Sequence, residues 1–294
     1  MPQQSEERIR DIIHKLNGQE IMEDADPEIK SMTGTTEGLV YIFTVNKEPK
    51  YVLKLDQSQE ILLAEQWLHT YRHCGLPPKL VYADPAHEYI VYTYTPGTTF
   101  RNRGVKSSWL RLLAEGLLNG YEPMLQTDKW GYWLGDSCQT WREFIERGVE
   151  YARKNVGDVL PAADYEYVKS MAGNTAIGGE DERFLLHGDC GVHNFVFHND
   201  TLSAVIDPCP IAGPVRYDFL YAFCSSPDDL NLETFLQAFQ LLVHESMETA
   251  KLIEEVIIQL YCRIGICRQH HPEDLEEYLK AWEYWKDLHK AGSR

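Results

Sequence analysis

Three oxygen-bearing side chains are spaced around one predicted β-hairpin in the segment FLLHGDCGVHNFVFHNDTLSAVIDP, residues 184–208. Asn194 precedes the first strand, FVFH, and Asp207 follows the second, LSAVI. Because antiparallel strands return to their starting level, these two residues are expected to lie side by side on strands about 5 Å apart. An amide oxygen and a carboxylate suit Mg²⁺, which takes its other ligands from water and phosphates. The spacing therefore predicts a magnesium site at the open end of the hairpin.

A third oxygen group, Asp189, lies five residues before Asn194 and directly after His187-Gly188. We expect it in a loop at the same end of the hairpin, where the metal does not need it as a ligand. Its role there would be to accept or orient the proton of an attacking hydroxyl.

The residues before this segment predict a small sheet that carries one helix. Ile9, Ile12, Ile13 and Leu16 repeat at helical spacing, and β-branched and aromatic runs alternate with turn residues farther on. This regular pattern of strands and turns ends at the turn-rich stretch 95–99. The expected elements are an N-terminal helix up to Gly18, a hairpin at 38–45 and 50–55, a helix at 58–73, and strands at 79–83 and 88–94.

Helical periods dominate after residue 100, and the only strong β signal there is the hairpin itself. The sequence therefore predicts an α+β fold with a small β-rich lobe, 1–94, a hinge, 95–99, and a larger mainly helical lobe, 100–294. The expected helices lie at about 106–126, 141–154 and 163–172, followed by a long apolar stretch at 232–268.

Lys54 stands out in the second strand of the first hairpin. Tyr51, Leu53 and Leu55 share one face of that strand, while Val52 and Lys54 share the other. This lysine therefore has apolar neighbours, unlike an ordinary surface lysine; the alternative is a solvated lysine on a hairpin.

Composition and charge exclude several other classes of protein. The 294 residues are 44% hydrophobic and 25% charged, as in an ordinary globular protein. The net charge of −17 argues against nucleic-acid binding. We find neither a signal peptide nor an apolar run long enough for a membrane span. The seven scattered cysteines form no CxxC pair, which favours reduced thiols and a cytoplasmic protein.

The combined pattern His187-Gly188-Asp189, Asn194 and Ile206-Asp207-Pro208 resembles the signature of the aminoglycoside phosphotransferase and choline kinase-like superfamily, whose fold resembles that of protein kinases. The resemblance covers roughly residues 20 to 225. It also includes a hinge-like Val91-Tyr92-Thr93-Tyr94, the run Trp130-Gly131-Tyr132-Trp133 ahead of Trp141, and Arg216-Tyr217-Asp218-Phe219.

This resemblance implies a two-lobed, protein-kinase-like small-molecule kinase with Asp189 as catalytic base and Asn194 and Asp207 as Mg²⁺ ligands. Lys54 would contact the α- and β-phosphates of ATP or GTP. Its acidic partner would be Glu60 or Glu65, with Glu60 preferred because Leu63 and Trp67 follow it at apolar spacing.

The nucleotide would also meet the hinge and a phosphate-covering loop. Tyr92 and Tyr94 belong to the hinge-like segment. The loop, residues 32–38, departs from GxGxxG, yet the backbone N–H groups of Gly34 and the hydroxyls of Thr35 and Thr36 could cradle phosphates.

Three other functions are compatible with parts of the pattern. His187, Asp189 and His193 form H-x-D-x3-H, which with Cys190 and His198 is compatible with a zinc or iron hydrolase. Such an enzyme has no use for a β-rich lobe with an inward lysine. An inactive binding module does not need the whole polar set, and a protein kinase would carry HRD and an APE-like segment. We therefore expect His187 to be structural, and His193 and His198 to be exposed or to pack in loops.

The acceptor implied by the resemblance is a hydroxyl-bearing antibiotic of aminoglycoside type or a metabolite. Choline, other amino alcohols and sugars are alternatives. A cationic acceptor needs acidic or aromatic residues, which the chain offers near its end; an ordinary solvated terminal helix is the other interpretation. These residues are Asp274, Glu276, Glu277, Trp282, Glu283, Tyr284 and Trp285.

Overall fold

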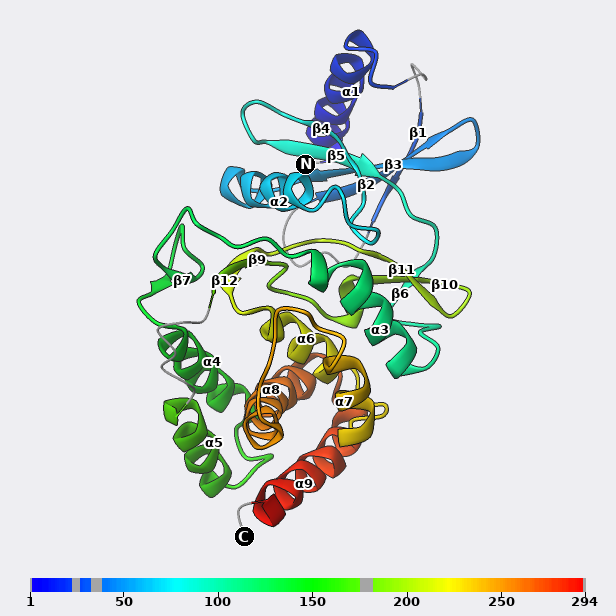
Figure 1. Ribbon diagram of the computed structural model, residues 1–294. Helices are drawn as coiled ribbons and strands as arrows, with labels where there is room; N and C mark the ends of the chain where they lie inside the picture. Colours follow the sequence, from blue (N-terminus) through cyan, green and yellow to red (C-terminus); the bar gives the residue numbers. More distant parts are fainter. Residues whose placement is uncertain (1, 23–26, 33–38, 175–181, 293–294) are drawn as a thin grey trace. The chain divides into compact units, whose positions relative to one another are not determined.

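The computed structural model describes residues 2–22, 27–32, 39–174 and 182–292, and its internal contacts divide the chain into two units (Figure 1). The first unit comprises residues 1–73 and 77–97, and the second comprises 74–76 and 98–294. Thr98–Thr99, inside the stretch expected to be the hinge, form strand β6 of the second unit. The roles assigned to the two lobes stay predictions.

The first unit is built on a five-stranded antiparallel sheet in the order β1-β2-β3-β5-β4. The hairpin of β2 and β3 closes through Asn46 and Lys47, whose φ angles of 54° and 68° are both left-handed. This tight turn lets β3 begin at Glu48, earlier than expected. The strands are β1 (Glu28–Ser31), β2 (Leu39–Val45), β3 (Glu48–Leu55), β4 (Leu80–Ala83) and β5 (Tyr89–Thr93).

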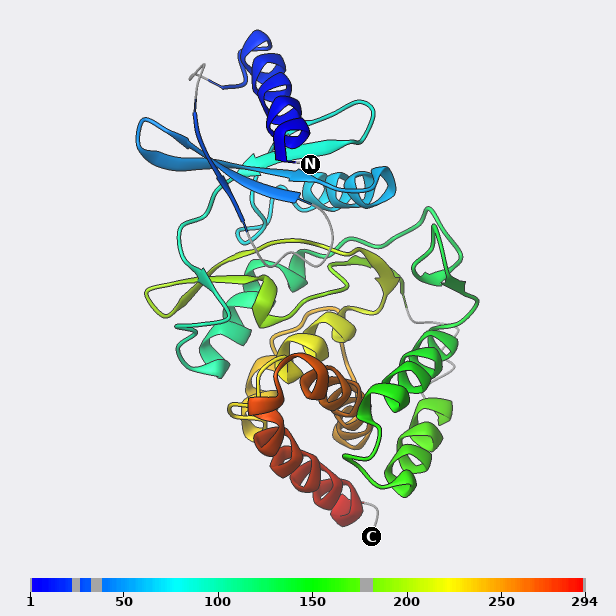
Figure 2. The same cartoon turned by 180° about the vertical axis from the view of Figure 1, so that it is seen from behind.

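Helices α1 (Pro2–Gly18) and α2 (Ser58–Thr70) cover opposite faces of this sheet, as Figures 1 and 2 both show. The apolar stripe of α1, from Ile9 to Leu16, packs against Phe43, Leu53 and Val91 in one buried cluster. The amphipathic N-terminal helix is therefore confirmed, and its burial is driven by the removal of apolar surface from water.

The second unit contains two small sheets, and the predicted hairpin belongs to one of them. Strands β10 (Phe195–His198) and β11 (Thr201–Val205) form that hairpin as expected, and β6 adds to its edge in the order β11-β10-β6. A second sheet has the order β8-β7-β12-β9. We did not predict this sheet, because its strands are too short to carry a period of two. They are β7 (Trp130–Gly131), β8 (Ser137–Cys138), β9 (Phe184–Leu186) and β12 (Ile211–Gly213).

The helices of the second unit follow the predicted ranges with one correction. The helix expected over 106–126 ends at Gly116, and the long apolar stretch 232–268 contains two helices. Helix α4 lies beside α5 and α8, and α8 beside α9 (Figure 2). None of the described helices has the length and apolar character needed to cross a membrane. The helices are α3 (Lys106–Gly116), α4 (Trp141–Val156), α5 (Ala162–Asn174), α6 (Val215–Cys224), α7 (Leu232–Phe239), α8 (Thr249–His270) and α9 (Leu275–Gly292), with short 3-10 turns η1 (Leu118–Gly120), η2 (Val192–Asn194) and η3 (Pro272–Asp274).

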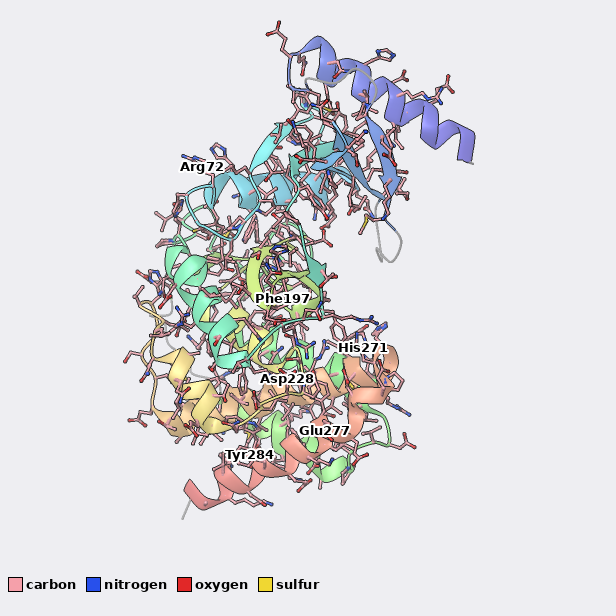
Figure 3. The ribbon with its side chains drawn as sticks, turned by 90° about the vertical axis from the view of Figure 1, so that its right-hand side faces the viewer. Arg72, Phe197, Asp228, His271, Glu277 and Tyr284 are labelled. Carbon is pink, nitrogen blue, oxygen red and sulfur yellow. The ribbon has the colours of Figure 1, made fainter. Side chains whose placement is uncertain are left out.

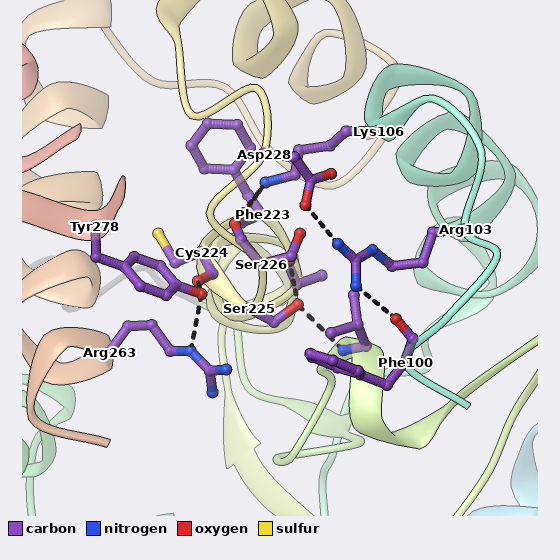
Figure 4. A network of polar contacts seen from close by, with 12 residues as sticks. Phe100, Arg103, Lys106, Phe223, Cys224, Ser225, Ser226, Asp228, Arg263 and Tyr278 are labelled. Atoms are coloured by element: carbon purple, nitrogen blue, oxygen red, sulfur yellow. Dashed lines mark hydrogen bonds and ion pairs between the residues drawn. The ribbon is translucent and has the colours of Figure 1, made fainter. Parts of the chain in front are cut away.

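The C-terminal end of α6 is anchored by a buried lysine (Figure 4). Lys106 Nζ donates to the carbonyl oxygens of Phe223 at 3.0 Å and Ser226 at 2.8 Å. A cation at this end also complements the helix dipole, although burial lowers the pKa of Lys106 to about 8. This anchor fixes the helix that supports the site described next.

Candidate active site

The loop carrying Asp189 turns sharply at Gly188. Its φ of +80° is left-handed, and a Cβ at this position would lie 2.0 Å from the carbonyl oxygen of Cys209. Only glycine fits there without a shift of the backbone. The close approach allows Cys209 N–H to donate to the carbonyl of His187 at 2.9 Å, which ties the loop to the chain after the hairpin.

His187 joins the same two segments through its side chain. Its Nδ1 accepts from the backbone N–H of Asp189 at 3.3 Å, and its Nε2 lies 2.9 Å from the carbonyl oxygen of Ile206. The ring is fully buried, and burial lowers its pKa to about 4. A neutral imidazole with its proton on Nε2 satisfies both contacts, so His187 has the structural role that we expected.

Asp218 holds the loop from helix α6. One of its carboxylate oxygens accepts from His187 N–H at 2.7 Å and from the Tyr121 hydroxyl at 2.6 Å, and the other accepts from Gly188 N–H at 3.0 Å. The side chain is completely buried, and burial raises its pKa to about 6 although these hydrogen bonds lower it.

Two more residues along the same face contact the loop, one on α6 and the other directly after its last residue, Cys224. Tyr221 and Ser225 follow Asp218 at helical positions i+3 and i+7. The Tyr221 hydroxyl donates to Asp189 Oδ1 at 2.6 Å, and Val192 N–H donates to Ser225 Oγ at 3.1 Å. One helix face therefore fixes the loop at three points along its length.

Asp189 is the centre of the resulting polar cluster. Besides Tyr221, its carboxylate contacts His193 Nε2 at 2.9 Å and accepts from Asn194 Nδ2 at 3.0 Å. Burial tends to raise the pKa of Asp189, but the contacts with His193 and Tyr221 outweigh it and hold the pKa well below its usual range. The Asp189 side chain is 37% exposed to solvent. An ionised, oriented carboxylate is thus open to solvent.

Asn194 and Asp207 lie at the open end of the hairpin. The backbone N–H of Ile206 donates to the carbonyl of Asn194 at 2.9 Å, which extends the strand pairing to this point. Because Asn194 Nδ2 donates to both the carbonyl and the carboxylate of Asp189, its amide oxygen is turned away from Asp189. Asp207 is exposed. One amide oxygen and one carboxylate form a hard donor set that fits Mg²⁺.

The hydrolase interpretation finds less support in this geometry. Both ring nitrogens of His187 are engaged in hydrogen bonds with the backbone, which leaves no lone pair for zinc. Among the described residues, no group of three or more His, Cys, Asp and Glu side chains is arranged to hold a metal ion.

Lys54, in the first unit, is 8% exposed and lies on the sheet face that α2 covers. Its Nζ is 3.8 Å from Asp56 Oδ2, a contact that the sequence reasoning missed although the two residues are near neighbours. Of the two competing glutamates, Glu65 pairs with His87 at 3.0 Å. The pairing of Glu60 with Lys54 stays a prediction.

The other residues predicted to bind nucleotide also belong to the first unit. Tyr92 is buried in β5, paired in register with Val52, and the backbone N–H of Tyr94 donates to the carbonyl of Lys50 at 2.8 Å. Gly34, Thr35 and Thr36 lie outside the described residues.

The aromatic and acidic residues near the C-terminus divide between the core and the exposed surface of α9. Trp282 and Trp285 are fully buried, and their indole N–H groups donate to Asp164 and to the carbonyl of Leu230. Glu277 and Tyr284 mark the exposed part of α9 (Figure 3). The tryptophans recur at the spacing of a core face, which favours the interpretation of this segment as an ordinary terminal helix.

Comparison with known families agrees with the geometry of the loop and hairpin. A family model described as "Phosphotransferase enzyme family" matches residues 28–248. The chain belongs to this phosphotransferase family. No curated protein sequence matches it.

Solved structures with the same fold include kinases that act on small molecules. A GDP complex of an aminoglycoside 2′-phosphotransferase-IIIa mutant has a TM-score of 0.58 at 15% identity, covering 95% of this chain and 97% of that chain. The streptomycin-ATP-APH(2″)-IIa ternary complex has a TM-score of 0.58 at 18% identity, covering 91% and 95%. A putative fructosamine-3-kinase from Haemophilus somnus 129PT has a TM-score of 0.58 at 14% identity, covering 95% and 96%. The predicted α+β, protein-kinase-like fold is confirmed.

Within this phosphotransferase fold, sequence reasoning missed the supports of Asp189. Tyr221 was not singled out, and Asp218 was noted only as part of a resembling segment. His193 is exposed as expected, yet it contacts Asp189 directly. The helical spacing of Asp218, Tyr221 and Ser225 was the available signal, because it places three polar residues along one face of the segment that contains α6.

Proposed function

We propose that this member of the phosphotransferase family transfers the γ-phosphoryl group of ATP or GTP to a hydroxyl of a small molecule. The observation that carries the proposal is the Asp189 carboxylate, which Tyr221, His193 and Asn194 orient while it stays partly open to solvent. A carboxylate in this state can accept a hydrogen bond from an alcohol and align it for attack.

Asp189 would act mainly by positioning. Its low pKa makes it a weak base, so it would take the proton only as the acceptor oxygen bonds to the γ-phosphorus. In that step the new O–P bond forms, the bond from the γ-phosphorus to the bridging oxygen breaks, and the nucleoside diphosphate leaves. Orientation and neutralisation of charge would supply most of the rate enhancement.

Asn194 and Asp207 would hold Mg²⁺, which when bound neutralises phosphate charge. Lys54 would contact the α- and β-phosphates and Glu60 would orient it. The remaining nucleotide contacts would come from the hinge residues Tyr92 and Tyr94 and from the loop residues Gly34, Thr35 and Thr36.

The class of acceptor is supported by the names of the structural neighbours, which include a streptomycin-ATP complex, a gentamicin complex and putative fructosamine-3-kinases. The acceptor would be an antibiotic alcohol of aminoglycoside type or a metabolite, with choline, other amino alcohols and sugars as alternatives.

A screen of purified protein tests the proposal. Thermal unfolding and coupled release of ADP or GDP would be measured with Mg·ATP and Mg·GTP against aminoglycosides, choline-type amines, sugars, amino-acid alcohols and uncharged aromatic alcohols. We expect nucleotide to raise the melting temperature and one class of acceptor to stimulate release of diphosphate. Absence of any nucleotide effect in both assays would refute the kinase function.

The metal site has a control on its own hairpin. Asp207 and Asp200 are both exposed aspartates with φ of 58°, at opposite ends of the hairpin. Asp207→Asn should weaken magnesium-dependent nucleotide binding by about tenfold or more, since it removes a charged ligand, whereas Asp200→Asn should not. Titration of nucleotide with and without Mg²⁺ measures the difference, and equal affinities for the two variants would exclude Asp207 as a ligand.

A further inference from the structure

The second unit contains a cavity of about 500 Å³ between helices α4, α6 and α8, near the β7–β8 turn. This volume is in the range of small-molecule sites. Tyr221 forms part of its wall, and the hydroxyl of the same tyrosine donates to Asp189 Oδ1 at 2.6 Å. The cavity and the proposed catalytic carboxylate therefore share one side chain.

The lining of this cavity is largely apolar. Five aromatic rings face it together with isoleucines, and two of these rings, Tyr132 and Tyr151, are 47% and 66% exposed. Two thiols and the amide side chains of Asn155 and Gln259 also line it, and burial raises the pKa of Cys262 to about 12, which keeps this thiol neutral. The aromatic residues are Tyr132, Phe144, Tyr151, Tyr217 and Tyr221.

The charged groups of the lining neutralise one another. Among the described lining residues only Asp136 and Arg147 are charged, and they form an ion pair of 2.7 Å. Arg147 is also 2.7 Å from Glu143. A polycation needs several carboxylates to replace its hydration, and this lining has one, which is already paired.

We infer that the cavity binds the body of an uncharged alcohol made largely of apolar rings and presents its hydroxyl to Asp189. The inference rests on the proposed function and narrows it, because it favours such an alcohol over a polycationic aminoglycoside or choline. Aromatic walls stack on flat rings and gain from removing apolar surface from water.

Gly148 provides a way to fill the cavity. It lies on α4 and lines the cavity, and a Cβ built on it meets no atom within 4 Å. Gly148→Phe would add a ring at the wall of the cavity without a clash at Cβ. Gly292→Phe adds the same ring at a helix glycine with equally open space outside the cavity, and it serves as the control.

The first measurement is direct binding by calorimetry, without nucleotide, of naphthylethanol and estradiol as apolar probes and kanamycin as the polycation. The apolar probes should bind the parent protein and Gly292→Phe at least about tenfold more tightly than Gly148→Phe, and kanamycin should bind weakly to all three. Tighter binding of kanamycin than of both apolar probes, equal apolar binding by the two variants, or no apolar binding at all would overturn the inference.

Release of diphosphate with the same compounds separates the two proposals. Apolar binding that Gly148→Phe abolishes, with neither release of diphosphate nor any effect of nucleotide on the melting temperature, supports the cavity and refutes the kinase function. Release with kanamycin and none with apolar alcohols supports the kinase function and refutes the apolar acceptor. If Gly148→Phe does not fold, as judged by thermal unfolding, the exposed Tyr151→Lys replaces it and should weaken apolar binding in the same assay.

Discussion

Asp189 lies in the loop that Asp218 holds from α6, and the pKa values of the two carboxylates are shifted in opposite directions. Each carboxylate has three polar partners: Asp189 contacts Tyr221, His193 and Asn194, while Asp218 contacts two backbone amides of the loop and one tyrosine hydroxyl. Yet the pKa of Asp189 is lowered well below its usual range, and that of Asp218 is raised to about 6.

Exposure to solvent separates the two groups. Burial favours the neutral acid in both, but Asp189 keeps 37% of its exposure and Asp218 keeps none. At Asp189 the hydrogen bonds outweigh burial, whereas at Asp218 they do not. Two carboxylates with the same number of hydrogen-bond partners can therefore differ in ionisation. The partly exposed one stays ionised and can take part in chemistry, whereas the fully buried one favours the neutral acid and holds a loop.

The largest effect is expected at Asp189. Asp189→Asn keeps the shape of the side chain but removes the negative charge that orients the acceptor hydroxyl. Turnover should fall by at least about 100-fold, while the affinity for nucleotide stays close to that of the parent. Steady-state kinetics and nucleotide titration measure both, and near-normal turnover would remove Asp189 from the mechanism.

A stability effect of moderate size is expected at Asp218. Asp218→Asn turns an amide group toward donors in the buried loop, and each donor left without an acceptor costs about 1–3 kcal/mol. Urea denaturation should therefore show a lower free energy of unfolding. Asp287→Asn, on the exposed side of α9, is the control and should change it by less than about 0.5 kcal/mol.

The pH dependence of that difference tests the raised pKa. Because the folded-state pKa of Asp218 is about 6, above its ordinary value of 3.8, its contribution is fully present below 3.8 and is lost as the pH rises through 6. The parent should exceed Asp218→Asn in stability most strongly near pH 4, and the gap should narrow by up to about 1.4 kcal/mol per pH unit between the two pKa values. A gap that widens toward pH 7 would contradict the raised pKa.

The sequence predicts those parts of the fold and of the candidate site that depend on residues close together in the chain. The hairpin was predictable because two runs rich in apolar residues flank Asn199 and Asp200, both of which take left-handed φ in the structure. The place of Lys54 on the face opposite Leu53 followed from the period of a strand in the same way.

Contacts between distant segments were not predictable by the same means. His187 and Gly188 meet Asp218 across some thirty positions of sequence, and no periodicity encodes that contact. The strands of the β8-β7-β12-β9 sheet have two or three residues each and depend on long-range pairing. The burial of Trp282 and Trp285 was not predictable for another reason, since an aromatic residue has the same chemistry in a core and in a binding site.

The smallest effect is expected at His193, and it sharpens the comparison most directly. His193→Ala removes one partner of Asp189 without burying the carboxylate, so the pKa of Asp189 should move up toward 3.8 and the acid limb of the pH-rate profile should shift to higher pH. Since Asp189 stays ionised at pH 7, turnover there should change by less than about tenfold.

The depressed pKa of Asp189 contributes stability above 3.8 that is lost as the pH falls through the folded value, so the variant should also lose stability mainly above that pH. His198→Ala, an exposed histidine at the other end of the hairpin, should leave the profile unchanged. An acid limb that does not move in His193→Ala would mean that exposure alone, and not the histidine, keeps Asp189 ionised.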